Sequence, residues 1–399
     1  MPRVQNRSRP PRRTLRRLLT ALVVLVVLAV VLLGAGGLYF AGQIDSDGLS
    51  AAHIADPQVY DLVVDAFTGG QITLHRTCGQ PERDDLATAD EYGLSWPGGT
   101  GVLTGAPERT AKTIRRDLTV VTGTAPTPGT RAALQRDVWP DPRAAYGVAY
   151  SDVAIPCGGG SCPAWFVPGS SSTWFIAVHG KDAKRSEPLR AMGPAISAGL
   201  PTLDISYRND PGAPETADHQ HAYGVTEWRD LQAAVVYAAG HGAKHVVLFG
   251  SSMGGAIVAS FLEHSPSAAM VRGVMFDAPA LDFRATVDWG AAHRTLPLIA
   301  TPIPGVLTAT AEWMAGWRYG VDWGAMDYLP GSWLTVPTLV FHGGDDLTVP
   351  VTTSDRLEAA HPQLVQEVVV PHAPHVGSWN VDPLAYEQRE STFLATVDG

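Results

Sequence analysis

The chain has 399 residues and a net charge of −10, with 45% hydrophobic and 17% charged residues, a composition typical of globular proteins rather than disordered ones. Seven of its 29 basic residues lie in the first 17 positions, where there is no acidic residue. The rest of the chain therefore has 22 basic and 39 acidic residues and is strongly acidic. Because such an acidic surface repels phosphate backbones, nucleic acid is excluded as an expected partner.

An uncharged apolar segment, residues 18–40, follows the basic tail of residues 1–17. At about 1.5 Å per residue, a helix of this length spans the roughly 30 Å hydrocarbon core of a bilayer. Arginines before the segment predict a cytoplasmic N-terminus, a single-pass anchor and an extracytoplasmic remainder. A cleaved signal peptide is the alternative, with loose cleavage sites at GAGG or YFAG, and a twin-arginine signal fits poorly.

Residues 41–140 are rich in strand-forming residues and are punctuated by glycine and proline, which predicts a β-rich accessory region. Two strand-like runs flank Gly69 and Gly70 and predict a hairpin. The sequence WPGGTGVLTG has the wrong glycine spacing for a nucleotide-binding loop. The function of this region cannot be inferred from its sequence.

Three cysteines, Cys78, Cys157 and Cys162, are spread along the chain. The stretch VAIPCGGGSCPAWFV predicts two strands joined by a glycine turn, with a cysteine on each side of it. Opposed positions of a hairpin lie within disulfide range, so an oxidising compartment favours a Cys157–Cys162 bridge. Two reduced thiols or a metal site are the alternatives, and Cys78 is left over.

From about residue 141 to the end, strand-like and helix-like segments alternate. This pattern predicts an α/β fold with a mainly parallel sheet covered by helices on both faces. The expected strands are 147–155, 164–167, 173–180, 201–208, 244–250, 271–279, 337–344 and 366–372. The expected helices are 184–199, 225–242, 253–264, 352–361 and 382–397.

The sequence GSSMG, Gly250 to Gly254, lies where a predicted strand passes into a predicted helix. A sharp turn there requires residues without bulk on both sides of Ser252, whose hydroxyl then projects from the carboxyl edge of the sheet. The following helix N-terminus offers free N–H groups to a developing negative charge. We therefore predict that Ser252 is a nucleophile.

A serine nucleophile requires a histidine base, and an acid that orients the histidine. In a sheet of this kind the chain order is Ser, then Asp or Glu, then His. One later strand ends in DDLTVP and the next in APHVGSWN, which supplies Asp345 or Asp346 as the acid and His372 or His375 as the base.

These motifs resemble the α/β-hydrolase superfamily, especially its branch of monoacylglycerol lipases, serine aminopeptidases and related membrane-anchored hydrolases. The resemblance covers about residues 145–399. The family pattern H-G-x-x-D-x-x-V-P implies Asp346 rather than Asp345, and the family's late histidine before a closing helix implies His375 rather than His372.

The resemblance also implies an oxyanion hole made by the backbone N–H groups of Lys181 and Met253, because HG at residues 179–180 resembles the family's oxyanion loop. We interpret His179 and His342 as structural. The chain departs from the lipases at Ser251, where they usually carry histidine, and this places the substrate analogy in doubt rather than the nucleophile.

An insertion at about residues 281–335 occupies the position of the family's cap. We expect aromatic side chains there to line an apolar substrate pocket or to pack among the cap helices. The segment SYRND, residues 206–210, is expected to border the cleft. Tryptophans occur in the insertion at positions 289, 313, 317, 323 and 333.

We expect a serine hydrolase that cleaves small-molecule or lipid esters without metal or cofactor, tethered to the membrane by its N-terminal helix. An aminopeptidase or amidase is the alternative; it would need an acidic cap residue facing Ser252. A non-catalytic binding module is the third reading, and the complete Ser, Asp and His argue against it. The acidic residues of the cap are Asp282, Asp288, Glu312, Asp322 and Asp327.

Overall fold

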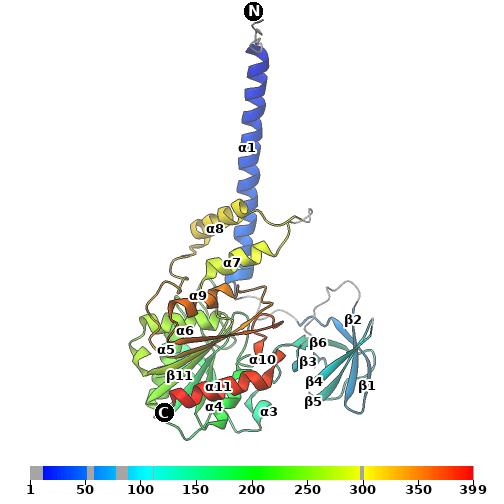
Figure 1. The fold of residues 1–399 in the computed structure, drawn as a ribbon, viewed down its shortest axis with the longest axis vertical. Coiled ribbons are helices and arrows are strands. Elements are labelled where there is room, and N and C mark those ends of the chain that lie inside the picture. Colours follow the sequence, from blue (N-terminus) through cyan, green and yellow to red (C-terminus); the bar gives the residue numbers. More distant parts are fainter. Residues whose placement is uncertain (1–11, 52–57, 78–88, 111, 297–300, 399) are drawn as a thin grey trace, which may run out of the picture. The chain divides into compact units, whose positions relative to one another are not determined.

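A computed structural model describes residues 12–51, 58–77, 89–110, 112–296 and 301–398 (Figure 1). The chain divides into two compact units. The helical unit comprises Met1–Gly48 and Arg294–Asp322, and the main unit comprises Leu49–His293 and Trp323–Gly399. Cys78 and most of the basic tail lie outside the described residues.

The helical unit contains α1 (Arg12–Gln43), which continues as the π-helix η1 (Ile44–Leu49), and α8 (Gly305–Tyr319). By length and composition, the stretch Leu15–Leu49 is a candidate membrane span, and its most apolar 18-residue window has a mean hydropathy of 3.1. The predicted cap at residues 281–335 is thus divided: its middle belongs with α1, and its two ends belong to the main unit.

The first part of the main unit is a closed β-barrel of antiparallel strands in the order β1-β2-β5-β4-β3-β6, which confirms the predicted β-rich region. The predicted hairpin is also confirmed, because Thr68 pairs with Gln71 across Gly69 and Gly70. Both glycines have positive φ, 59° and 81°, as a tight hairpin turn requires. The strands are β1 (Leu62–Thr68), β2 (Gln71–Arg76), β3 (Tyr92–Trp96), β4 (Gly99–Arg109), β5 (Ile114–Gly123) and β6 (Arg131–Gln135).

The second part is a sheet in the order β14-β13-β12-β11-β9-β10-β8-β7. Its strands from β14 to β10 are parallel, and β8 and β7 add an antiparallel edge. Along the chain, the strands are added on one side of β9 first and on its other side from β11 onward. In sheets of this kind, ligands bind at the carboxyl ends of the strands where this direction changes, here between β9 and β11. The strands are β7 (Ser151–Cys157), β8 (Gly160–Val167), β9 (Thr173–Val178), β10 (Thr202–Ile205), β11 (His245–Ser251), β12 (Val271–Asp277), β13 (Thr338–Gly343) and β14 (Val365–Val370).

Helices cover both faces of this sheet, as predicted, with α4 and α11 packed together and α5 packed on α6. All the expected helices are present, and three short ones, α3, η3 and α10, were not anticipated. The helices of the main unit are α3 (Pro142–Tyr146), α4 (Leu189–Ser197), α5 (Trp228–Gly240), α6 (Met253–His264), η3 (Pro266–Met270), α7 (Phe283–Ala292), α9 (Thr352–Ala360), α10 (Ser378–Val381) and α11 (Pro383–Val397).

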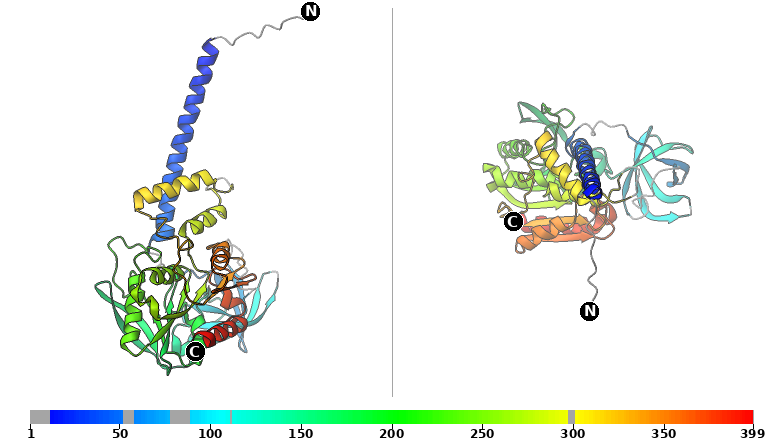
Figure 2. Two further views of the ribbon diagram at one scale, coloured as in Figure 1. Left: turned by 60° about the vertical axis from the view of Figure 1, so that its left-hand side comes forward. Right: turned by 90° about the horizontal axis from the view of Figure 1, so that it is seen from above.

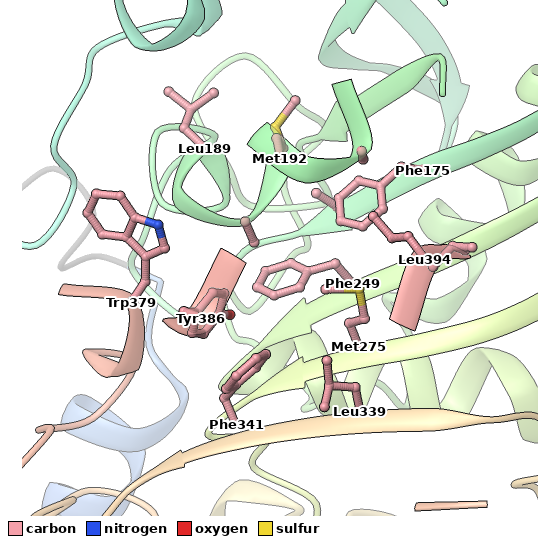
Figure 3. Close-up of a cluster of buried hydrophobic side chains, with 14 of the residues drawn as sticks. Phe175, Leu189, Met192, Phe249, Met275, Leu339, Phe341, Trp379, Tyr386 and Leu394 are labelled. Carbon is pink, nitrogen blue, oxygen red and sulfur yellow. The ribbon is translucent and has the colours of Figure 1, made fainter. Parts of the chain in front are cut away.

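The core beneath α4 and α11 is built from buried side chains of adjacent strands (Figure 3). Phe175, Phe249 and Phe341 project from three strands toward Met192 of α4 and Leu394 of α11. Each such side chain contributes roughly 1.5–3 kcal/mol when it leaves water. This packing fixes the strands whose carboxyl ends carry the predicted site.

A disulfide joins Cys157 to Cys162 across the β7–β8 hairpin, with 5.8 Å between the Cα atoms. The predicted pairing is therefore present, although the two cysteines are not directly opposed, because Cys157 pairs with Gly160 in the ladder and Cys162 with Ile155. Asp230 lies beside both sulfur atoms. Since its carboxylate accepts hydrogen bonds from Arg208, this cluster does not favour the metal alternative.

Candidate active site

Ser252 occupies the turn between β11 and α6 with φ 49° and ψ −119°, a left-handed conformation that is rare for a residue with a side chain. The flanking glycines permit this turn. A Cβ on Gly250 would lie 2.6 Å from the carbonyl oxygen of Gly254, and a Cβ on Gly254 would lie 2.3 Å from that of Val178. The motif therefore encodes the turn through steric exclusion, as the sequence predicts.

The structure brings together the serine, histidine and aspartate selected by the motifs. Ser252 Oγ lies 2.8 Å from His375 Nε2, and His375 Nδ1 lies 2.7 Å from Asp346 Oδ2. The rejected candidates pair with each other instead: His372 Nδ1 is 3.3 Å from Asp345 Oδ2, and their side chains are 76% and 66% exposed. The arrangement matches the geometry of a nucleophile, a base and an orienting acid.

The carboxylate of Asp346 is buried and fully engaged. Its Oδ1 accepts hydrogen bonds from the N–H groups of Thr348 and Val349 at 2.7 and 2.9 Å. Its Oδ2 lies 3.4 Å from His342 Nε2 as well as close to His375. Burial acts to raise the pKa of Asp346, but His375 and His342 outweigh it and hold this pKa below its usual range. Asp346 is thus suited to balance a positive charge on His375.

The two backbone groups expected to bind an oxyanion lie on either side of the crevice at β9 and β11. Met253 is the first residue of α6, so its N–H has no carbonyl one turn earlier to bind. Lys181 follows Gly180, which approaches the serine so closely that a Cβ on it would lie 3.1 Å from Ser252 Cβ. Lys181 thus follows a residue that lies beside the serine, and Met253 follows the serine itself; their role as oxyanion donors stays a prediction.

Glu187 is a site residue that the sequence did not reveal. Its buried Oε1 accepts hydrogen bonds from Ser251 Oγ at 2.6 Å and from the N–H of Gly180 at 2.8 Å. Burial acts to raise the pKa of Glu187, but Arg190 and the Ser251 hydroxyl lower it overall. The serine at position 251 thus helps to fix the loop that carries Lys181.

His179 and His342 are both buried and hydrogen-bonded, in agreement with their structural interpretation. His179 Nε2 lies 2.8 Å from Asp210 Oδ2, and its Nδ1 lies 2.8 Å from the carbonyl oxygen of Gly180. Burial acts to lower the pKa of His179, but Asp210 raises it to about 9. His342 Nδ1 lies 2.7 Å from Ser354 Oγ. The SYRND segment therefore contributes Asp210, which holds the loop after β9.

Comparison with known proteins identifies relatives without a described activity. No family model matches the chain. An uncharacterized protein of Mycobacterium tuberculosis, found in strains CDC 1551 / Oshkosh and ATCC 25618 / H37Rv, is 27% identical over 222 residues. The matched region is 53% of this chain and 66% of the relative, so the chain spans just under two thirds of the relative's length.

Among solved structures, the esterase Pf2001 of Pyrococcus furiosus is similar in two crystal forms. The TM-scores are 0.50 and 0.51 at 19% and 20% identity, and the match covers 65% of this chain and 96% and 95% of the esterase. At this identity the likeness concerns the fold. The chain has the α/β-hydrolase fold. Its α/β-hydrolase domain carries the sheet β7–β14, and the barrel precedes it.

A cavity of about 960 Å³ lies beside His375. Its wall on one side comes from loops of the α/β-hydrolase domain and on the other from the β-barrel, a role that the sequence did not reveal. Its size is at the upper end of ordinary ligand pockets. Lining residues from the hydrolase domain include Lys181, Asp182, Glu187, Leu347 and Pro374, and those from the barrel segment include Asp61, Arg76, Tyr92, Leu134 and Arg136.

Arg136, just after β6, links the two walls. Its guanidinium donates a hydrogen bond to the backbone carbonyl of His375, although the two residues are 239 positions apart in the chain. The amide of Asn380 donates hydrogen bonds to the carbonyl oxygens of Glu91 and Arg136, at 3.0 and 3.2 Å. The barrel is thus hydrogen-bonded to the loop that holds the predicted base.

The cap tryptophans are not among the residues that line this cavity, and their expected role in an apolar substrate pocket stays a prediction. Trp289 Nε1 instead donates to the backbone carbonyl of Asp346 at 3.0 Å, and Trp333 Nε1 donates to the carbonyl of Tyr328. Trp323 stacks on Phe283 with 5.5 Å between ring centroids. These three side chains pack within the main unit, as the packing alternative predicts.

Proposed function

We propose that the protein is a serine hydrolase that cleaves carboxylic esters through an acyl-enzyme intermediate. The observation that carries the proposal is the continuous chain of hydrogen bonds from Ser252 Oγ through His375 to Asp346, with distances of 2.8 and 2.7 Å. A serine hydroxyl becomes an effective nucleophile only when such a base accepts its proton.

In the proposed mechanism Ser252 attacks the acyl carbonyl carbon while His375 accepts the hydroxyl proton. Asp346 orients the imidazole and balances its charge. The N–H groups of Lys181 and Met253 bind the oxyanion of the tetrahedral intermediate. His375 then protonates the leaving alcohol, and water, activated by the same histidine, hydrolyses the ester at Ser252.

The cavity favours a substrate with polar groups near the ester. Its lining contains the charged side chains of Arg136, Lys181 and Glu187, together with a similar share of apolar surface. A glycerol ester or another ester with a hydroxylated or charged alcohol matches this lining better than a purely aliphatic one.

We further propose that α1 anchors the enzyme and that catalysis takes place on the outer face of the membrane. The arginines before the apolar segment of α1 and the disulfide between Cys157 and Cys162 support this orientation. Protease added to intact spheroplasts is expected to digest the domain that carries Ser252 and to spare a cytosolic marker. If the domain is protected from the protease until the membrane is broken, the proposed orientation is wrong.

A fluorophosphonate probe tests the nucleophile directly. We expect it to label the wild-type enzyme and the Ser161→Ala control, in which an exposed hairpin serine is replaced, but not Ser252→Ala. Ester turnover by Ser252→Ala is expected to fall by about 10⁴-fold or more. Labelling that survives in Ser252→Ala would refute the assignment.

An aminopeptidase would need a carboxylate free to bind the substrate's ammonium group. The cap residue Asp282 instead caps α7 and pairs with Arg356, and Asp327 accepts a hydrogen bond from the N–H of Leu329. Because these two cap carboxylates already have partners, neither of them supports the aminopeptidase alternative. Comparing p-nitrophenyl esters with amino-acid p-nitroanilides separates the two activities, because the aminopeptidase would favour the anilides.

A further inference from the structure

Helix α8 exposes a stripe of apolar side chains. Val306, Trp313 and Trp317 are 62%, 68% and 72% exposed, and Ala309 between them is exposed too. Their spacings of three, four and four residues place all of them on one face of the helix. A helix that faces water carries polar residues on its outer face, whereas this face has none.

The charged residues of α8 lie away from this stripe. Glu312 is buried, and the guanidinium of Arg318 stands over the ring of Tyr319. Two neighbouring exposed tryptophans without a charge between them are unusual on a surface in contact with water. Indole side chains of this kind gather where an apolar phase meets a polar one.

A side of α8 next to the stripe packs on α1, which α8 crosses near the C-terminal end of that helix (Figure 2). The contact depends on two glycines. A Cβ on Gly36 would lie 2.9 Å from Leu307 Cδ1, and a Cβ on Gly37 would lie 2.6 Å from Thr310 Cγ2. Small residues of this kind allow two helices to approach closely.

The position of this contact along α1 matches one boundary of a bilayer. Residues from Leu18 to Leu32 are exposed, and burial of α1 begins only at Leu33. The rise from Leu18 to Gly36 is roughly 27 Å at about 1.5 Å per residue, close to the thickness of the hydrocarbon core. Tyr39, also exposed, lies just beyond that point, where aromatic residues of membrane proteins concentrate.

We propose that α8 is an interfacial membrane helix whose stripe of Val306, Ala309, Trp313 and Trp317 inserts among the lipid headgroups beside α1. This inference rests on the anchoring role proposed for α1. The main unit would then be connected to the membrane by two helices. The chain enters the main unit after η1, and it leaves and re-enters the main unit at the two ends of the segment Arg294–Asp322. The enzyme is thereby held at the surface that contains lipid esters.

Tryptophan quenching in the full-length protein, reconstituted in phosphatidylcholine–phosphatidylglycerol nanodiscs, tests the insertion. Lipids with a doxyl group near the headgroup are expected to quench wild-type emission more than lipids labelled near the chain end. The shallow quenching should fall severalfold in Trp313→Phe/Trp317→Phe and remain in the control Trp165→Phe/Trp228→Phe, whose tryptophans lie in the α/β-hydrolase domain.

Equal quenching in wild type and Trp313→Phe/Trp317→Phe would overturn the inference. So would a stable dimer in detergent that is lost in Trp313→Ser/Trp317→Ser, since a second copy of the chain would then cover the stripe. The phenylalanine variant keeps an apolar stripe, so a loss of folding would not explain its result.

Turnover provides the functional readout. Trp313→Ser/Trp317→Ser is expected to hydrolyse a long-chain ester in vesicles about fivefold more slowly and soluble p-nitrophenyl acetate at the wild-type rate. Equal loss on both substrates would contradict an interfacial role. Failure of the probe to label Ser252 would refute the proposed function and leave the quenching result intact, so the two failures are distinguishable.

Discussion

The β-barrel and the sheet of the α/β-hydrolase domain use their strands in opposite ways. In β5 of the barrel, buried Arg116 and Leu118 alternate with exposed Asp117 and Thr119. Every residue of β9 and β13 in the sheet is buried. Strands with one face toward a barrel interior alternate, whereas parallel strands covered on both sides are continuously apolar.

This difference determines where catalytic side chains can come together. Parallel strands end at the same edge, so the loops after β9, β11, β13 and β14 bring Lys181, Ser252, Asp346 and His375 together. An antiparallel barrel divides its loops between two ends. The barrel accordingly reaches the cleft through a limited set of residues, of which Arg136 contacts the loop of His375.

The largest effect is expected from a change at the carboxyl edge of the sheet. Asp346→Asn removes the negative charge that balances His375 and favours the wrong tautomer of the imidazole, so kcat should fall by roughly 10³–10⁴-fold. Asp345→Asn is the matched control, because its side chain is exposed and pairs only with His372 among the described residues. Comparable losses in both variants, measured by ester turnover, would contradict the assigned geometry.

The next effect concerns a buried acid at the end of β12. Burial raises the pKa of Asp277 to about 6 from its usual 3.8. The folded protein therefore binds this proton more tightly than the unfolded chain, and stability declines as pH rises from about 4 to 6. Asp277→Asn should reduce that decline by at most about 3 kcal/mol, measured by urea unfolding at pH 4 and pH 7.

An unchanged pH dependence in Asp277→Asn would show that other buried acids of the sheet dominate it. The comparison with the barrel predicts a control: Asp117→Asn, on the exposed side of β5, should leave the same pH dependence unaltered.

Removing the disulfide tests how much the antiparallel edge of the sheet, β7 and β8, contributes to stability and to turnover. Cys157 and Cys162 close a short loop, for which the chain-entropy model gives about 2 kcal/mol of stabilisation. Cys157→Ser/Cys162→Ser should lower the free energy of unfolding by that amount and leave ester turnover unchanged, since β7 and β8 carry no part of the proposed triad. A large loss of turnover would show that the edge supports the site.

The smallest effect should come from the barrel, and it tests whether the barrel is more than an appendage. Arg136→Ala removes a charge-assisted hydrogen bond to the carbonyl of His375, which predicts about a tenfold lower kcat/KM. Arg115→Ala is the control, because this arginine pairs with Glu108 on the barrel. Wild-type turnover in Arg136→Ala would assign the barrel a purely structural role.

Local chemistry in the sequence was sufficient to predict the turn around Ser252 and the order of Asp346 and His375. The glycines at 250 and 254 are required by contacts with backbone atoms of neighbouring turns and strands. The continuous apolar strands and their intervening helices likewise predicted the parallel sheet. Each of these features leaves a short local signature in the sequence, a motif or an apolar run, even where the contacts it serves are distant.

The tertiary structure alone revealed Glu187, Arg136 and the divided cap. Glu187 accepts a hydrogen bond from Ser251 across 64 positions, and Arg136 donates one to His375 across 239. Trp313 and Trp317 lie exposed on α8 in the helical unit, whereas Trp289 lies in the main unit and donates a hydrogen bond to the carbonyl of Asp346. A single sequence carries no signal for such pairings, since they depend on which surfaces meet once the strands and helices have packed.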